Sequence, residues 1–155
     1  TQASGVKWAA ASGSSTQYLV FARNSSGQAI TTGTQTTVTG WTETTDTDND
    51  FNNTTGVWTC STAAKYYFIS TITFGDTVAA SDRNVFIRDV TNSVDLAHNI
   101  RPFSTAGSGQ TTQTVVACVD AAIGRQISIQ VSHGAGSNQP LVAVATRNTL
   151  TIIKA

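Results

Sequence analysis

The residues of this chain with the clearest capacity for chemistry lie between positions 41 and 60. Four of the nine acidic residues fall in this stretch, namely Glu43, Asp46, Asp48 and Asp50. The three aspartates alternate along the chain, and oxygen ligands at alternate positions are how an EF-hand calcium loop begins. A weak calcium site on Asp46, Asp48 and Asp50 is therefore one prediction for this stretch.

The rest of the stretch departs from the EF-hand pattern. Counted from Asp46, the sixth position should be Gly and the twelfth a bidentate Glu, but Phe51 and Val57 stand there. An EF-hand is excluded, whereas a looser calcium site completed by carbonyl oxygens or by another subunit stays open. The simpler interpretation is a surface turn, because Asp and Asn bond to their own backbone and tolerate left-handed conformations.

Nucleophilic catalysis and zinc binding find little support in the sequence. A triad needs a Ser or Cys, a His and a carboxylate within mutual reach, and a zinc site needs His and Cys at close spacing. The two histidines, His98 and His133, and the two cysteines, Cys60 and Cys118, are scattered singly. We predict no catalytic residues, no enzymatic activity and no cofactor beyond the weak calcium ion.

The two cysteines are too few for a disulfide framework. Cys60 and Cys118 each end or interrupt an apolar strand pattern. We therefore predict two buried thiols that act as small hydrophobic side chains. A single Cys60–Cys118 bridge stays open as the alternative, provided that their strands are neighbours.

The composition favours an all-β domain and argues against two classes of partner. Only 12% of the 155 residues are charged, and the formal net charge is zero. The chain therefore lacks the basic surface of a nucleic-acid-binding protein, and it has no basic amphipathic stretch for a membrane surface. No apolar run approaches the roughly 20 residues of a membrane-spanning helix. Thr is abundant, and Thr suits the surface of a strand better than that of a helix.

The pattern along the chain divides it into two parts. Residues 1–17 are small and polar, which is typical of a linker or attachment segment. Residues 18–155 form one domain of eight to ten short strands separated by turn signals, which indicates a sandwich, a jelly roll or a barrel. The expected strands are 18–22, 36–41, 56–60, 65–74, 84–89, 94–99, 112–119, 125–131, 141–145 and 149–153.

The longest expected strand, 65–74, has aromatic residues on both faces. Tyr66 and Phe68 fall on one face with other apolar residues, and Tyr67 falls on the opposite face with Ile69. Alternation with period two predicts that the first face is buried in the core. The second face also carries apolar side chains, which need another surface to shield them from solvent.

Five segments in order resemble the jelly roll of the complement-head and tumour-necrosis-factor superfamily, and most closely its bacteriophage version at the ends of tail and head fibres. They are ASGVKWAAASGSS (3–15), TQTTVTGWTETTDTDNDFNNTTGVWTC (34–60), STAAKYYFISTITF (61–74), VDAAIGRQISIQV (119–131) and NTLTIIKA (148–155). One departure is Ala63-Ala64-Lys65, where many relatives carry Pro and Gly. The resemblance implies an antiparallel jelly-roll sandwich over residues 18–155.

The resemblance also implies a homotrimer. In this superfamily three jelly rolls pack side by side and bury an aromatic-rich face at the threefold axis. Tyr66, Tyr67 and Phe68 are the residues of this chain expected at that interface. The alternative is that the second face of their strand is covered by a sheet edge or a loop of the same molecule.

The function that follows from the resemblance is that of a virion structural protein. We expect a trimeric fibre-tip or head-fibre decoration domain on the particle surface that mediates attachment to a host. Its partners would be further copies of itself, other virion proteins through residues 1–17, and a host-surface glycan or protein. Two alternatives stay open, a capsid decoration or trimerisation module with no ligand and a secreted lectin or adhesin. The sequence does not identify the ligand-binding residues.

Overall fold

The computed structural model describes residues 18–76, 81–103 and 109–155. The predicted linker, residues 1–17, lies outside them. The described residues form thirteen strands: β1 (Tyr18–Asn24), β2 (Ala29–Ile30), β3 (Thr36–Thr37), β4 (Trp41–Asp46), β5 (Phe51–Asn52), β6 (Val57–Thr59), β7 (Ala64–Asp76), β8 (Ser81–Asp89), β9 (Val94–Phe103), β10 (Gly109–Ala121), β11 (Gln126–His133), β12 (Gln139–Pro140) and β13 (Thr149–Lys154). Within these ranges there is no helix, and hence none long and apolar enough to cross a membrane.

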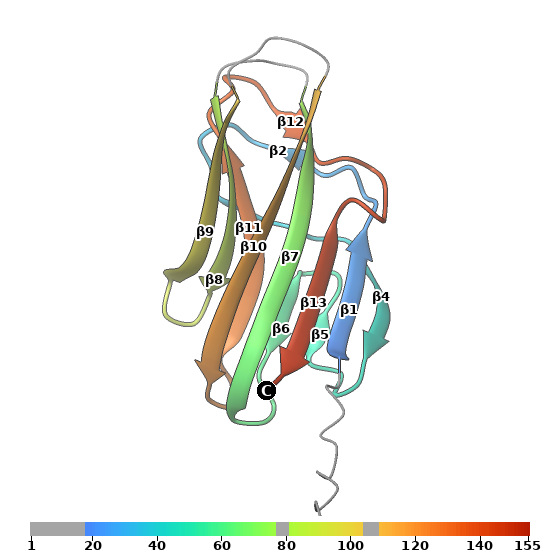
Figure 1. Ribbon diagram of the computed structural model, residues 1–155, viewed down its shortest axis with the longest axis vertical. Coiled ribbons are helices and arrows are strands. Elements are labelled where there is room, and N and C mark those ends of the chain that lie inside the picture. The colour runs from blue at the N-terminus through green and yellow to red at the C-terminus, as the bar shows by residue number, and fades with distance from the viewer. Residues whose placement is uncertain (1–17, 77–80, 104–108) are drawn as a thin grey trace, which may run out of the picture.

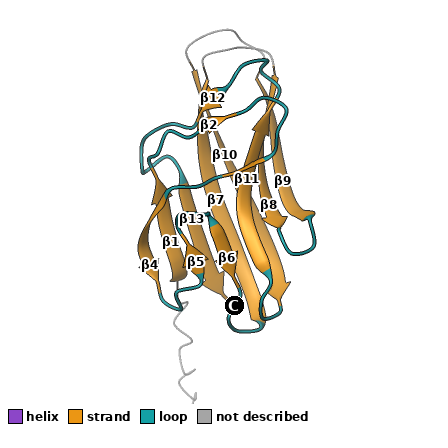
Figure 2. Cartoon of the chain, turned by 180° about the vertical axis from the view of Figure 1, so that it is seen from behind, coloured by secondary structure: helices purple, strands orange, loops and turns teal. Residues whose placement is uncertain are grey.

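The strands form two antiparallel sheets packed face to face. Figure 1 looks onto the five-stranded sheet, whose order is β10-β7-β13-β1-β4. Figure 2 shows the molecule from behind, where the six-stranded sheet runs β5-β6-β11-β8-β9 with β3 paired to β11. A small third sheet joins β12 to β2. The predicted all-β antiparallel sandwich is confirmed.

The two longest strands show why this sequence forms sheets. β7 and β10 pair over thirteen residues without a register shift. Along β10 the side chains alternate between buried and exposed from Thr111 to Ala121, as the pleat of a strand requires. Val115 and Val119 enter the core, while Val116 and Cys118 face outward.

Three aromatic rings of the core form contacts between the two sheets. Trp58, on β6, contacts Tyr66 and Phe68, both on β7, with ring centroids 4.8 and 5.2 Å apart in edge-on geometry. All three side chains are almost completely buried. Each such pair is worth about 1 kcal/mol beyond the burial of its area, so these contacts hold the two sheets together.

Two predicted strands differ from the structure. The stretch 36–41 is divided into β3 and the start of β4 at Trp41, and β4 continues into the acidic stretch as far as Asp46. The predicted strand 141–145 was wrong, since only Leu141 forms an isolated bridge, to Phe74.

Residues 141–145 bond their backbone outside a strand ladder, and the buried side chain of Asn148 contributes. The N–H groups of Leu141 and Val142 donate to the carbonyls of Gln28 and Thr73, both at 2.9 Å. The Asn148 amide Nδ2 donates to the carbonyl oxygens of Val142, at 2.6 Å, and Asn24, at 3.3 Å. Its Oδ1 accepts the backbone N–H of Thr73 at 2.8 Å. One amide thus satisfies backbone groups from three segments, which is the role that a strand ladder would otherwise have.

The cysteine predictions were wrong for one residue. Cys60 is buried, as predicted, but Cys118 is exposed on the outer side of β10, and both thiols are free. The strict alternation of β10 places Cys118 outside, because its neighbours Ala117 and Val119 occupy the core positions. The Cys60–Cys118 bridge is therefore absent.

A buried ion pair connects the two turns at the end of the sandwich where β8 finishes. Asp89, 1% exposed, accepts bonds from the backbone N–H and the side-chain amide of Asn92 at 3.0 and 2.7 Å. The Arg125 guanidinium lies 2.8 and 2.9 Å from the same carboxylate. Burial alone would raise the pKa of Asp89, but the bonds from Asn92 and Arg125 together hold that pKa below its usual value.

Replacing Asp89 should destabilise the fold in a pH-dependent way. We expect Asp89→Asn to lower the free energy of unfolding at neutral pH by about 2–3 kcal/mol, because it leaves Arg125 without its carboxylate. A depressed folded-state pKa contributes stability above the unfolded value of about 3.9, and this stability is lost as the pH falls through the folded pKa. The free energies of unfolding of the parent protein and of Asp89→Asn, both measured with urea, should therefore become equal in strongly acidic buffer.

The matched control is Asp120→Asn. Asp120 pairs with Lys65 at 3.8 Å, and both side chains are more than half exposed, so its loss should change stability by less than about 0.5 kcal/mol. Equal losses at the two positions would contradict the proposed importance of the buried pair.

Candidate functional site

The acidic stretch folds as a strand, a tight turn and a second strand. β4 ends at Asp46, residues 47–50 turn, and β5 begins at Phe51. Asn49 adopts a left-handed conformation with φ of 56°, which Asn tolerates better than most residues. The stretch is therefore less of a loop than the sequence predicted, and its turn is confined to four residues.

The carboxylates of this turn bind backbone and hydroxyl groups. Asp46 accepts the N–H groups of Asp50 and Phe51 at 3.2 and 3.0 Å. Asp50 accepts the hydroxyl of Ser61 at 2.8 Å and its N–H at 3.3 Å. Asp48 is exposed. Among the residues that the structure describes, no group of three or more His, Cys, Asp or Glu is arranged to hold a metal.

An open hollow of about 620 Å³ lies beside the acidic turn. The Asn52 side chain lines it and accepts the N–H groups of Thr54 and Thr55 at 3.1 and 2.9 Å, so this oxygen serves the turn itself. Glu43 lines the hollow too, and burial, followed by the charge of Asp46, raises the pKa of Glu43. The surface of this hollow is acidic, but Asp50 and Asn52 already accept hydrogen bonds from other groups of the chain.

The two histidines lie far from any triad geometry. His98 stacks on Phe86 with ring centroids 4.1 Å apart, and its Nε2 lies 3.2 Å from Oδ1 of Asn84. His133 is buried, with both ring nitrogens bonded to backbone groups. Neither bonds to a carboxylate within the described residues. The absence of catalysis stays a prediction.

The outer face of the five-stranded sheet carries an exposed apolar surface. On two neighbouring strands, Tyr67 is opposite Cys118 and Ile69 is opposite Val116. Tyr67 is 41% exposed and Val116 56% exposed. The surface continues onto β13, where Ile153 is opposite Tyr67. It also reaches β1, because Thr151 of β13 is opposite Ile69 on one side and Phe21 on the other. We call Phe21, Tyr67, Ile69, Val116, Cys118 and Ile153 the apolar patch.

Of the three aromatic residues predicted at an interface, the structure leaves only Tyr67 available. Tyr66 and Phe68 are 0% and 1% exposed and belong to the core, because the pleat sends them to the opposite side of β7. The Tyr66 hydroxyl donates to the carbonyl of Thr62 at 2.5 Å. Burial, aided by the neighbouring Cys60, raises the pKa of Tyr66 to about 12. The place of Tyr67 at an interface stays a prediction.

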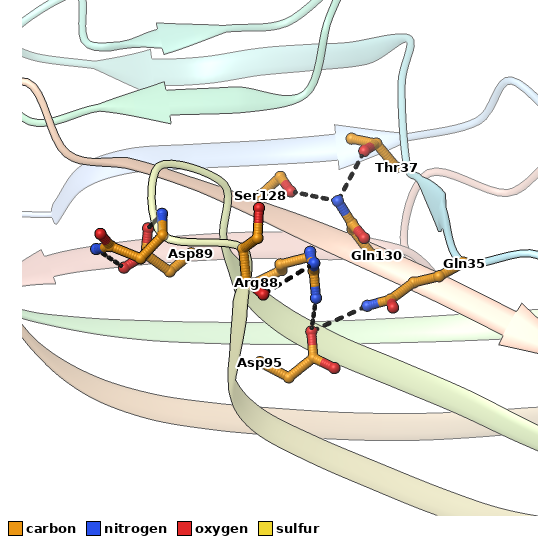
Figure 3. Close-up of polar contacts among 9 residues, drawn as sticks. Gln35, Thr37, Arg88, Asp89, Asp95, Ser128 and Gln130 are labelled. Atoms are coloured by element: carbon orange, nitrogen blue, oxygen red, sulfur yellow. Dashed lines mark hydrogen bonds and ion pairs between the residues drawn. The ribbon is translucent and has the colours of Figure 1, made fainter.

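Polar side chains on the outer face of the six-stranded sheet bond to one another. Arg88 lies 2.7 Å from Asp95, which also accepts the amide of Gln35 at 3.0 Å (Figure 3). Gln130 donates to the hydroxyls of Thr37 and Ser128 at 3.1 and 3.2 Å (Figure 3). These polar side chains are thus linked within the chain. In the apolar patch, the Arg23 guanidinium lies 5.1 Å from the centroid of the Phe21 ring, while Tyr67 and Val116 are exposed.

The chain is similar in structure to proteins of low sequence identity. Murine APRIL, in a crystal structure at pH 5.0, matches with a TM-score of 0.66 and 14% identity over 90% of this chain and 100% of that chain. The globular domain of zebrafish complement 1qA protein matches with a TM-score of 0.56 and 15% identity over 88% of this chain and 94% of that chain. No protein-family model and no curated protein matches the sequence. These likenesses show the fold, which is the tumour-necrosis-factor-like jelly roll.

The Asp46 carboxylate should stabilise the acidic turn. We expect Asp46→Ala to lower the free energy of unfolding by about 1–2 kcal/mol, because two backbone N–H groups lose their acceptor. Asp48→Ala is the control, and it should change stability by less than about 0.5 kcal/mol since its side chain is exposed. Chemical denaturation measures both, and similar losses in the two variants would contradict this role.

The predicted calcium site can be tested separately. We expect millimolar calcium to leave the melting temperature unchanged, because Asp46 and Asp50 already bind groups of the chain. A ligand that binds only the folded state raises the melting temperature. A calcium-dependent rise that disappears in Asp48→Ala would therefore support the predicted metal site on this turn.

Proposed function

We propose that this chain is a trimeric structural module of a virion, a fibre-tip or head-fibre decoration domain that attaches the particle to a host surface. Three copies would associate through the apolar patch, and residues 1–17 would join the module to other virion proteins. The attachment would be binding without catalysis, to a glycan or a protein of the host surface.

The observation that carries the proposed association is the exposure of the apolar patch. Tyr67 and Val116 lie on adjacent strands and expose 41% and 56% of their surface. Exposed apolar side chains that are contiguous across several strands mark interaction surfaces more often than isolated ones do. An aromatic residue among aliphatic neighbours also suits the core of an interface, which is depleted in charge. A second copy of the chain would supply the missing cover.

The virion setting is supported by the ordered sequence segments that resemble bacteriophage fibre domains. Their order agrees with the tumour-necrosis-factor-like jelly roll of the structure. Three copies of one binding surface would raise avidity without strong single sites. A decoration or trimerisation module would bind capsids and ignore host cells, and a secreted lectin or adhesin would bind host surfaces without any particle. Binding assays of the isolated domain against cells and capsids distinguish these outcomes.

Interrupting the apolar patch should dissociate the trimer. Light scattering of the parent domain at micromolar concentration should give three times the 16.2 kDa mass of the chain. Val116→Arg should shift this mass toward the monomer, because it places a charge in an apolar interface at a cost of several kcal/mol. The far-ultraviolet spectrum should be retained, since the side chain is outside the core.

Val94→Arg is the matched control. Val94 is the same residue type with similar exposure, 51%, but it begins β9 in the other sheet. This variant should keep the trimeric mass. A monomeric parent domain at micromolar concentration would refute the proposed assembly, and so would a Val116→Arg variant that remains trimeric.

A further inference from the structure

A second hollow, of about 600 Å³, lies between the start of β8 and the end of β11. This is the end of the sandwich opposite the C-terminus (Figure 1). The lining of this hollow is polar, unlike the apolar patch. Several of its side chains keep unused hydrogen-bonding positions, whereas Asp50 and Asn52 of the acidic hollow already accept hydrogen bonds from the chain. The lining residues that matter for the chemistry of the second hollow are Gln35, Ser81, Asp82, Asn84, Ser132 and His133.

One wall of the hollow is held in place by His133. The Nδ1 of this ring accepts the backbone N–H of Ala135 at 3.2 Å, so the ring proton is on Nε2, which donates to the carbonyl of Ile30 at 2.8 Å. The carbonyl of His133 accepts the N–H of Gly33 at 2.7 Å. The fully bonded imidazole and the carbonyl of His133 thus tie residues 30–33 to the end of β11, and the wall is formed before any ligand arrives.

The polar groups on the opposite side retain hydrogen-bonding capacity. The Asn84 amide donates to the hydroxyl of Ser132 at 3.2 Å, and its oxygen lies 3.2 Å from Nε2 of His98. These bonds orient the amide but use one of its two N–H donors and one acceptor position. Ser132 keeps its own O–H for donation. Asp82 is exposed and accepts no hydrogen bond from the part of the chain that the structure describes.

The charge of the hollow selects among ligands. Asp82 provides the one charged group among the described residues that line it, and the adjacent Arg83 is 0% exposed. An anionic ligand would meet a carboxylate without a compensating cation. A hydroxyl-rich neutral ligand can instead donate to Asp82 and exchange further bonds with the amides and hydroxyls. The volume lies in the range of small-molecule sites, and is far larger than an ion needs.

We propose that this hollow binds a neutral saccharide through Asp82, Asn84 and Ser132. The proposal rests on the proposed attachment function for its biological role, and it names the ligand class and the site that this function leaves open. Its position away from the C-terminus and from the apolar patch keeps it accessible when copies of the chain associate through that patch. Each site would be weak, and three copies would act together.

The test uses neutral methyl glycosides of glucose, galactose and mannose with the isotope-labelled domain. At least one should cause saturable amide shifts in residues 81–84 and 132–134 at millimolar concentration. Asp82→Asn should weaken this binding by about tenfold or more, because a bond to a charged acceptor is lost. The control Asp120→Asn, an exposed carboxylate elsewhere on the molecule, should bind like the parent.

Three results would overturn the proposal. They are the absence of shifts in these residues with all three glycosides, unchanged affinity in Asp82→Asn, and equal or tighter binding of glucuronate at the same residues. Light scattering of the same samples distinguishes a failure of the saccharide proposal from a failure of the proposed trimeric assembly. A trimer that binds host cells but no glycoside removes only the saccharide site, whereas a monomer that binds a glycoside removes only the proposed assembly.

Discussion

The pleat of β7 is the constraint on which the rest of this structure depends. Successive side chains of a strand point to opposite faces, so Tyr66, Tyr67 and Phe68 cannot all enter one core. Tyr66 and Phe68 pack against Trp58 and join the two sheets. Tyr67 is thereby forced outward, beside Ile153 and Cys118. The same contacts that stabilise the core thus create the exposed surface through which we propose that copies of the chain associate.

The two sheets use their outer faces for different purposes. On the six-stranded sheet, even the aromatic Phe86 is covered by a side chain of the same molecule, His98. Its polar neighbours are linked through Arg88, Asp95 and Gln130. On the five-stranded sheet, Tyr67 and Val116 face solvent beside the exposed Cys118. We therefore propose assembly through the five-stranded sheet and ligand binding on the six-stranded sheet.

Long strands were predictable from the sequence as segments, but their inward and outward faces were not always predictable. The expected strands 65–74 and 112–119 lie within β7 and β10. Residues 66–69 and 115–119 are continuous apolar runs, so the sequence does not show that Cys118 faces outward while Ala117 and Val119 hold the core positions. The stretch 141–145 could not be predicted, because its apolar residues suggest a strand, whereas its backbone bonds to Gln28, Thr73 and the side chain of Asn148.

The candidate sites were less predictable, because they depend on residues far apart in the chain. The acidic stretch was visible in the sequence, but the binding of Asp50 to Ser61 follows from the packing of two strands. The second hollow joins Asp82 and Asn84 to Ser132, about fifty positions away. None of these residues forms a motif by spacing. Only the register of β8 against β11 brings them together.

The pairing of β1 has a mechanical consequence. β1 is hydrogen-bonded on both sides, to β13 and to β4, and Tyr18 is opposite Ile153 near the C-terminus. The hydrogen bonds of antiparallel strands run perpendicular to the strand axis. Tension applied at Tyr18 and resisted at the far end of the sandwich would therefore shear two ladders at once. Many bonds would share the force, whereas a strand peeled from an edge would lose them one by one.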